Sequence, residues 1–362
     1  MKSVDIDVQQ APEGESTLGQ RLVRWLWRKE YAATPGPRGL SAAQEKLVRW
    51  MSLSKQLHQQ SPRRARSTYL LLDRFFGIDR VSLAQVSDHQ IPVASGFIVV
   101  RCYQSSRSVH SKGAPGLVYF HGGGCVIGDL DTHDSFCRWV AKAAGITVLS
   151  VDYRLAPEHG FPTQITDAIE GWNWVCEHAD DWGLDVTRLG VGGDSAGGYL
   201  AASVCQQAIQ SEFQVEPTHK PAFQWLIYPW LDCRLVSESS NRCVADMLLT
   251  RDTMSYFIDH MLGQQNAHQS PVAESPLASP ALAHNLEALP PTYLATAGFD
   301  PLNSEGKEYA ERLRQAGVAV DEAEFTEMMH GFISLAGVCA HALSRSDQMI
   351  QGLSRLVKGQ VG

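Results

Sequence analysis

The chain has 362 residues, of which 44% are hydrophobic and 19% are charged, and its formal net charge is −8 at neutral pH. This length predicts one large core with an accessory lobe, and the composition is that of an ordinary folded protein. The negative charge disfavours nucleic acid and anionic lipid as partners. Arg63, Arg64 and Arg66 form a local basic stretch, which we interpret as a solvated helix face.

Neither the N-terminal segment nor the cysteines indicate export or metal binding. Residues 1–17 contain no apolar segment and no cleavage site of small residues, and the chain has no run of about 18 apolar residues, so stable membrane insertion is not expected. Both features favour the cytoplasm. The cysteines form no CxxC pair and no Cys/His ligand spacing, which predicts no metal site and mostly reduced, buried thiols. They are Cys102, Cys125, Cys137, Cys176, Cys205, Cys233, Cys243 and Cys339.

The first 90 residues predict helices. Leu18, Leu22, Trp25 and Leu26 recur at helical spacing. Ser41 followed by Gln44 predicts a capping box at the start of a second helix, and Pro62 predicts the start of a third. No residue in this region suggests chemistry.

From about residue 90, short apolar runs alternate with helical segments. This alternation predicts a mostly parallel sheet with helices on both faces. The segment 231–262 interrupts it, because it is too long for a simple connection and contains a helix capped by Thr250. We expect this segment to be an insertion that completes the accessory lobe. The predicted strands are 97–102, 117–120, 146–151, 189–192, 223–228, 293–297 and 318–325, and the predicted helices are about 133–144, 163–179, 195–210 and 304–316.

The segment Gly193-Asp194-Ser195-Ala196-Gly197 fits the pattern G-x-S-x-G. It lies between a predicted strand and a predicted helix, which is the context in which this pattern exposes a nucleophilic serine. The two glycines allow the strand and helix backbones to approach each other, and the N-terminus of the helix faces the developing oxyanion. We therefore predict Ser195 as the nucleophile.

The segment His121-Gly122-Gly123-Gly124 follows the predicted strand 117–120 and matches the glycine-rich loop that stabilises an oxyanion. We predict the backbone amides of Gly122, Gly123 and Ala196 as the donors. His121 and Gly124 are expected to support the loop.

A serine nucleophile of this type is followed in the chain by an acid and then by a histidine. Asp300 follows the predicted strand 293–297, at the carboxyl end where sites assemble in open sheets. His330 follows the predicted strand 318–325. His330 is the predicted general base for Ser195, and Asp300 is predicted to orient it.

Several segments, in this order, resemble the hormone-sensitive lipase family, which includes the bacterial family IV esterases, and in particular its GDSAG branch. They lie between about residues 95 and 335: LVYFHGGG (117–124), DYRLAPEH (152–159), FPTQITDAIEGWNWV (161–175), GDSAGG (193–198), FDPLNSEG (299–306) and HGF (330–332). Two features depart from the family pattern. Cys125 stands where a bulky aromatic residue is more common, and DPLNSEG stands where an arginine and an acid are common.

The resemblance implies an α/β-hydrolase fold with an eight-stranded, mostly parallel sheet. It also implies a mobile helical cap made of residues 1–90 and the insertion at about 231–262, over a catalytic domain of residues 91–362. The implied activity is that of a serine carboxylesterase acting on short to medium acyl esters through an acyl-enzyme, without a cofactor.

The candidate substrate-binding residues are Cys125, Met247, Leu248, Leu249, Phe257 and Phe332, with Met254 and Met261 as further cap residues. Ordinary helix packing is an equally good interpretation of the cap residues. Two alternatives stay open on the same fold: a ligand-binding receptor, of the kind that has lost the catalytic histidine, and another hydrolytic or dehydrating enzyme such as an amidase, peptidase or dehydratase. The partner is a small ester, and a homodimer is left open.

Overall fold

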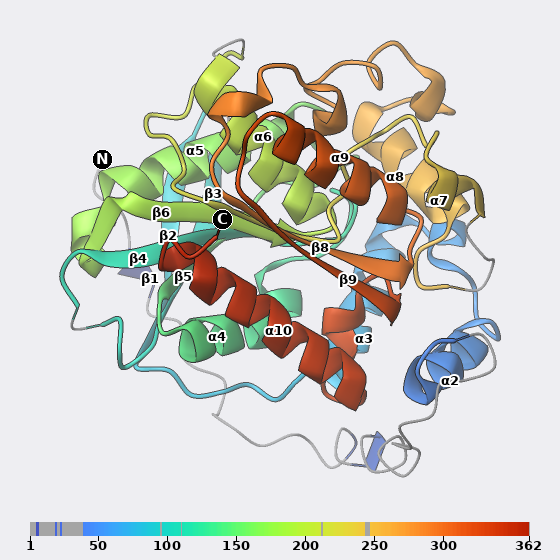
Figure 1. Ribbon diagram of the computed structural model, residues 1–362. Coiled ribbons are helices and arrows are strands. Elements are labelled where there is room, and N and C mark those ends of the chain that lie inside the picture. Colours follow the sequence, from blue (N-terminus) through green and yellow to red (C-terminus); the bar gives the residue numbers. More distant parts are fainter. Residues whose placement is uncertain are drawn as a thin grey trace.

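The computed structural model describes residues 5–6, 19, 22–23, 39–94, 96–109, 111–210, 213–242 and 247–361. These residues form one twisted sheet with helices on both faces (Figure 1). The strand order is β1-β2-β3-β5-β4-β6-β7-β8-β9, and from β5 to β9 all neighbours are parallel. The strands are β1 (Asp5–Ile6), β2 (Gln85–Val93), β3 (Gly96–Gln104), β4 (Ala114–Phe120), β5 (Thr147–Asp152), β6 (Leu184–Asp194), β7 (Gln224–Ile227), β8 (Thr292–Phe299) and β9 (Val320–Met329).

The seven predicted strands are confirmed as β3 to β9. The eighth strand that the family resemblance implied is β2, which pairs antiparallel with β3. No sequence pattern predicted this strand. Its sequence QVSDHQIPV contains polar residues and a proline, and only Ile91 is buried. The two-residue strand β1 extends the sheet beyond β2.

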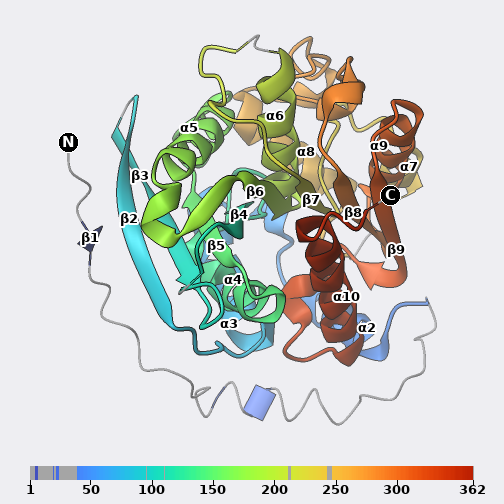
Figure 2. The ribbon, with the colours of Figure 1, turned by 60° about the vertical axis from the view of Figure 1, so that its left-hand side comes forward.

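Helices cover both faces of the sheet, as Figures 1 and 2 show. The buried side chains form two hydrophobic clusters. One cluster packs α5 (Thr163–Glu177), α6 (Ala196–Gln210) and α9 (Asn303–Gln315) against the sheet, and the other packs α4 (Leu130–Ala144) and α10 (Ala340–Val357). The four helices predicted in this region are confirmed within a few residues. Helix α10 was not among them.

The described part of the N-terminal lobe consists of α2 (Ala42–Met51), the 3-10 turn η1 (Leu57–Gln59) and α3 (Pro62–Phe76). Proline at the first position of α3 is as predicted. Ser41 occupies the N-cap position of α2, but the predicted capping box is wrong. The Ser41 hydroxyl accepts no backbone hydrogen bond and receives one from the Gln44 side chain instead (2.9 Å). The predicted helix around Leu22 lies almost wholly outside the described residues.

The connection between β7 and β8 spans residues 228–291 and is longer than the predicted insertion at 231–262. Its helices are α7 (Glu238–Arg242) and α8 (Arg251–Leu262), with the 3-10 turns η3 (Ala267–Gln269), η4 (Pro280–Leu282) and η5 (Leu286–Ala288). Thr250 caps α8, as predicted, by accepting a hydrogen bond from the amide of Thr253. The insertion meets the N-terminal lobe, since the His58 ring lies 3.3 Å from the Thr253 hydroxyl.

Two further 3-10 turns, η2 (Ala179–Trp182) and η6 (Phe332–Leu335), complete the described elements. Within the ranges given above, no helix has both the length and the apolar character needed to cross a membrane. The seven cysteines described are all buried and unpaired by disulfides, and Cys243 lies outside the described residues.

Candidate active site

The nucleophile candidate, Ser195, occupies a sharp turn between β6 and α6. Its φ is 54°, a left-handed conformation that a non-glycine residue adopts only when its surroundings enforce it. The surroundings do so with three backbone hydrogen bonds: the Ser195 amide donates to Ile227, and the Ser195 carbonyl accepts from the amides of Tyr199 and Trp230. The side chain is therefore aimed by the backbone.

The glycines on either side of this turn permit the close packing that the motif predicted. A Cβ atom at Gly197 would collide with the carbonyl oxygen of Phe120 on β4, and one at Gly193 would collide with Gly197 itself. Helix α6 can therefore lie directly against the ends of β4 and β6. This packing brings the turn next to the loop that follows β4.

The structure brings Ser195, His330 and Asp300 together in one chain of hydrogen bonds. His330 Nε2 lies 2.8 Å from Ser195 Oγ, and His330 Nδ1 lies 2.7 Å from Asp300 Oδ2. The other Asp300 oxygen accepts the amide of Leu302 at 2.8 Å. All three side chains are at least nine-tenths buried, and the acid and the base come from the carboxyl ends of neighbouring strands, β8 and β9. This geometry allows proton transfer from the hydroxyl to the imidazole.

The glycine-rich loop after β4 lies beside Ser195, but its amides are used differently from our prediction. The amide of Gly122, a predicted oxyanion donor, donates to the carboxylate of Asp194 at 2.9 Å and is not available for substrate. Gly123 and Gly124 have positive φ angles (122° and 60°) and both line the cavity that contains Ser195. The amides of Gly123, Gly124 and Ala196 have no hydrogen-bond acceptor in the described part of the chain.

His121 contacts this loop and the side chain of Tyr153. Its Nδ1 lies 2.8 Å from the carbonyl oxygen of Gly122, its ring stacks on Tyr153 with centroids 4.3 Å apart, and the Tyr153 hydroxyl donates to its carbonyl. Burial, with His133 nearby, lowers the pKa of His121 to about 4. A neutral imidazole held between a carbonyl and a ring fits the predicted supporting role.

A buried network around Asp194 was not predicted from the sequence. Besides the amide of Gly122, the Asp194 carboxylate accepts the Tyr119 hydroxyl at 2.6 Å and lies 3.3 Å from His133 Nε2. Burial opposes the charge of Asp194, but His133 and Tyr119 outweigh it, so its pKa lies below the ordinary value. Burial likewise disfavours charge on His133, yet Asp194 raises its pKa. Asp194 lies inside the G-x-S-x-G motif, whereas no sequence pattern marked His133.

A cavity of about 720 Å³ opens onto Ser195 and His330. Its walls are mainly apolar and come from both the N-terminal lobe and the insertion. Of the six predicted substrate-binding residues, Leu248, Leu249 and Phe257 line it. The residues of the N-terminal lobe that line it include Leu47, Trp50, Met51, Leu57, Thr68, Tyr69, Leu71, Leu72, Phe75 and Phe76.

The other three predicted substrate-binding residues do not line this cavity. Cys125 has a φ of 59° and is wholly buried in the hydrophobic core that contains Tyr153, where burial raises the pKa of its thiol. Phe332 packs edge to face on Tyr228 and Phe325, and Met247 is buried in the same cluster. All three are therefore core residues.

Arg66 also departs from our prediction of a solvated helix face. From α3, its guanidinium donates to the carbonyls of Val126 (2.8 Å) and Ala156 (2.9 Å) and pairs with Glu158 (2.6 Å). Val126 belongs to the turn closed by Gly123, whose carbonyl accepts from the amides of Val126 and Ile127. The N-terminal lobe is thus bonded directly to the glycine-rich loop.

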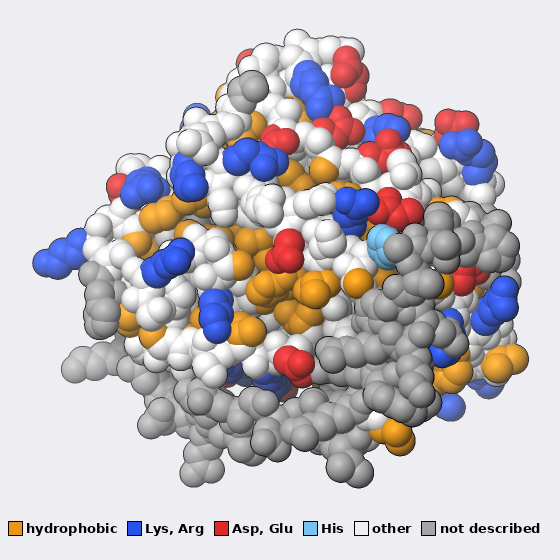
Figure 3. Space-filling model, turned by 60° about the horizontal axis from the view of Figure 1, so that its bottom comes forward, with side chains coloured by type: hydrophobic (Ala, Val, Ile, Leu, Met, Phe, Trp, Pro, Cys, Tyr) orange, Lys and Arg blue, Asp and Glu red, His pale blue; other side chains and the backbone are white. Residues whose placement is uncertain are grey.

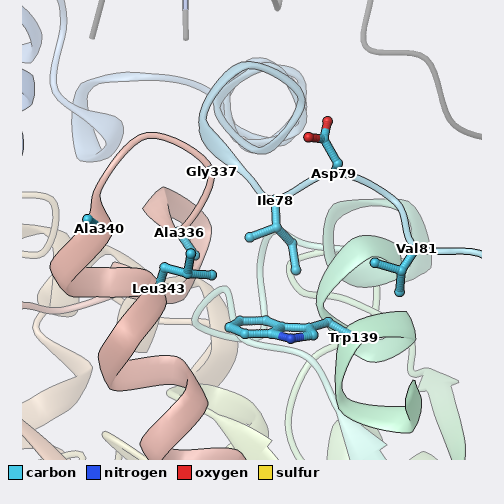
Figure 4. A pocket seen from close by; sticks show the side chains of 8 residues that line it. All are labelled: Ile78, Asp79, Val81, Trp139, Ala336, Gly337, Ala340 and Leu343. Atoms are coloured by element: carbon cyan, nitrogen blue, oxygen red, sulfur yellow. The ribbon is translucent and has the colours of Figure 1, made fainter. Parts of the chain in front are cut away.

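A second hollow, of about 570 Å³, lies where the end of α3 meets α4 and α10 (Figure 4). Trp139, Leu343 and Ile78 make it apolar, and it contains no nucleophile. In the view of Figure 3, which brings the lower side of Figure 1 forward, hydrophobic side chains gather near the centre between charged ones. Among the described residues no three His, Cys, Asp or Glu side chains are placed to hold a metal ion.

Comparison with known proteins shows the family of the chain. Residues 117–334 match the model of an α/β-hydrolase-fold family. The chain is 40% identical over 270 residues to the carboxylic ester hydrolase LipN of Mycobacterium tuberculosis. The aligned residues cover 74% of this chain and 69% of LipN. The chain belongs to the hormone-sensitive lipase family of α/β hydrolases.

Two further relatives extend this likeness. Ethyl acetate hydrolase of Pseudomonas putida is 35% identical over 266 residues, covering 73% of this chain and 78% of its own length. The structure of the ester hydrolase EH1AB1 from the metagenome of Lake Arreo, in complex with a bipyridine phosphonate derivative, superimposes with a TM-score of 0.80 and 32% identity. That superposition covers 87% of this chain and 98% of the other.

The close packing at Gly197 leads to a first prediction. Gly197→Ala should lower the free energy of unfolding by about 3 kcal/mol or more, because the added methyl group meets rigid backbone. Urea unfolding followed by circular dichroism would measure this change. Gly160→Ala is the matched control, since that exposed glycine has ordinary contacts and the change should stay within about 0.5 kcal/mol. Equal stability of both variants would contradict the packing argument.

The pair of Asp194 and His133 leads to a second prediction. Because the folded state raises the pKa of His133, protonated His133 adds stability below its unfolded pKa, near 6.5, and this stability is lost as the pH rises through the folded value. The lowered pKa of Asp194 adds stability above about 3.9, which is lost as the pH falls through its folded value. The pair should therefore contribute most between about pH 4 and 6.5.

His133→Gln should accordingly destabilise the fold by roughly 3 kcal/mol near pH 5.5 and by less at pH 9. Unfolding curves of variant and wild type across this pH range would measure the difference. His219→Gln, at an exposed position, serves as the control and should show no such trend. A His133→Gln loss that is constant with pH would show that the histidine is not charged in the fold.

Proposed function

We propose that this chain is a serine carboxylesterase that hydrolyses short to medium acyl esters through an acyl-enzyme on Ser195. The observation that carries the proposal is the continuous hydrogen-bonded chain from Asp300 through His330 to Ser195, which ends inside a mainly apolar cavity. Ester hydrolysis needs a nucleophile, a base and donors for an oxyanion at one point. The esterases among the relatives support the same activity.

In the first half of the reaction, Ser195 Oγ attacks the acyl carbon and its proton passes to His330 Nε2. Asp300 accepts the Nδ1 proton and stabilises the imidazolium that forms. The carbonyl oxygen becomes negatively charged, and we assign its stabilisation to the free amides of Gly123, Gly124 and Ala196, with Gly124 in place of the predicted Gly122. The imidazolium then gives its proton to the departing alcohol.

In the second half, water takes the place of the alcohol. His330 removes a proton from the water, the hydroxyl attacks the acyl carbon, and the returned proton restores Ser195 as the acid departs. Besides the ester and the water, each step uses groups of this chain. The receptor alternative fits poorly, because it concerns receptors that have lost the catalytic histidine, and here His330 contacts Ser195. A cytoplasmic location stays a prediction, and a homodimer stays open.

The third prediction tests the nucleophile. Ser195→Ala should lower kcat for p-nitrophenyl acetate by about 10⁴-fold to 10⁶-fold, because no acyl-enzyme can form. A small phosphonate ester should label the wild type at one site, identified as Ser195 by mass spectrometry of its peptides. Ser203→Ala is the control: that buried hydroxyl donates to Tyr199 within the same helix and its loss should leave turnover unchanged. Labelling of another serine would contradict the proposal.

The fourth prediction concerns chain length. The Phe257 ring lies against Gly124, where an added Cβ would meet it, and so it limits the cavity beside the oxyanion donors. Phe257→Ala should shift the preference among p-nitrophenyl esters, from acetate to palmitate, towards longer acyl chains. Met254→Ala, on the same helix but outside the cavity, should lose stability without this shift. If both variants keep the wild-type preference, Phe257 does not limit the acyl chain.

A further inference from the structure

The N-terminal lobe makes a contact next to the catalytic base that a simple lid would not need. Gln44 of α2 is wholly buried, and its side-chain amide contacts the last residues of β9. Its Nε2 donates to the carbonyl oxygen of Glu327 at 3.1 Å, and its Oε1 accepts the amide of Met329 at 2.8 Å. His330 is the next residue.

The position of β9 in the sheet explains why this contact matters. β9 is the last strand of the order and pairs only with β8, so its other edge has no strand beside it in the described part of the chain. A carbonyl and an amide two residues apart on such an edge are the groups that a neighbouring strand would bind. The side-chain amide of Gln44 donates to the carbonyl and accepts from the amide. It thus takes the place of a neighbouring strand immediately before His330.

Gln44 is itself held in place. Its Nε2 also donates to the Ser41 hydroxyl at 2.9 Å, and that hydroxyl lies 3.3 Å from the Cys339 sulfur. Leu40, Leu47 and Val48 are buried in the hydrophobic cluster that contains Phe332 and Ile333, just after the base. Residues in and just before α2 thus share one hydrophobic cluster with the residues that follow His330.

The backbone at the end of β9 carries His330 into the site. The amide of His330 makes a long hydrogen bond, of 3.4 Å, to the carbonyl of Phe299 on β8. The chain then turns at Gly331, which has a φ of 72°. His330 must at the same time meet Ser195 on one side and Asp300 on the other. A shift of the end of β9 would disturb both contacts.

We infer that the N-terminal lobe takes part in setting the catalytic geometry, with Gln44 as a positioning residue for His330. The inference rests on the proposed function, in which His330 is the general base. The lobe also reaches the other half of the site, through the bonds of Arg66 to Val126 and Ala156. The cap is thus a fixed support for the base and the oxyanion loop as well as a wall of the cavity.

Gln44→Met tests this role, because it keeps the length of the side chain and removes both bonds to β9. A displacement of about 1 Å at a catalytic group can cost about 10²-fold in rate. We therefore expect kcat for p-nitrophenyl acetate to fall between about 10-fold and 100-fold, with KM changed less than about twofold. The rate at which a small phosphonate labels Ser195 should fall by the same factor, because that reaction needs the base and little of the cavity.

Gln206→Met is the matched control. Gln206 is also a buried glutamine, and its Nε2 donates to the carbonyl of Pro280 (2.9 Å) and reaches the Tyr309 hydroxyl (3.2 Å), away from the triad. This variant should show a drop in Tm comparable to that of Gln44→Met, but Ser195 should be labelled at the wild-type rate. Labelling at the wild-type rate by Gln44→Met, or equal slowing of both variants, would overturn the inference.

Gln44→Asn provides a second test if the methionine variant does not fold. Its amide remains polar but is one methylene too short to reach both groups of β9, so labelling should again be slow. A folded Gln44→Asn protein that is labelled at the wild-type rate would also overturn the inference. A wild-type chain that is not labelled at Ser195 would instead contradict the proposed function, which separates the two failures.

Discussion

The buried carboxylate of Asp194 is the contact on which the rest of the site depends. It precedes Ser195, accepts the amide of Gly122 and the hydroxyl of Tyr119, and faces His133. A buried charge is tolerated only where such partners surround it. Because one carboxylate binds the glycine-rich loop and lies next to the nucleophile in the chain, the distance between the serine and the oxyanion donors is set by a single group. The Gly122 amide is used for this purpose, which leaves the next two amides of the loop facing the cavity.

What the sequence could predict follows from how local each signal is. The strands β4, β5, β7 and β8 are short apolar runs that are largely buried. Ser195, Asp300 and His330 each follow a strand, so their meeting at one edge of the sheet could be inferred from order alone. Strand β2 gave no signal, because its sequence QVSDHQIPV is mostly polar and contains a proline. Roles that depend on the direction of a side chain could not be predicted from the sequence either. Cys125 and Phe332 have the right place in the chain but point into the core.

Long-range bonds of polar side chains were equally beyond prediction. Gln44 looked like part of a capping box, and Arg66 like one of three solvated arginines, because a pattern of neighbours cannot reveal a partner more than 50 residues away. In the structure the Gln44 side chain accepts a hydrogen bond from the amide of Met329, at the end of β9. The Arg66 side chain donates to the carbonyl of Val126, just after the glycine-rich loop. Local rules fail here because tertiary contacts provide better partners than the helix end or water does. Both failures concern residues that join the N-terminal lobe to the catalytic domain.

The lobe therefore combines two tasks that are often separate in enzymes. Leu47 and Met51 of α2 line the cavity, while Gln44, one turn earlier on the same helix, holds the end of β9. Helix α3 does the same on the other side, with Leu72 in the wall and Arg66 on the oxyanion loop. Protein interiors are close-packed and transmit displacement, so a substrate that moves the wall of the cavity also moves the supports of the base and the oxyanion donors. Contacts between the substrate and the cavity far from the ester bond can in this way change the rate of the chemical step as well as the affinity for substrate.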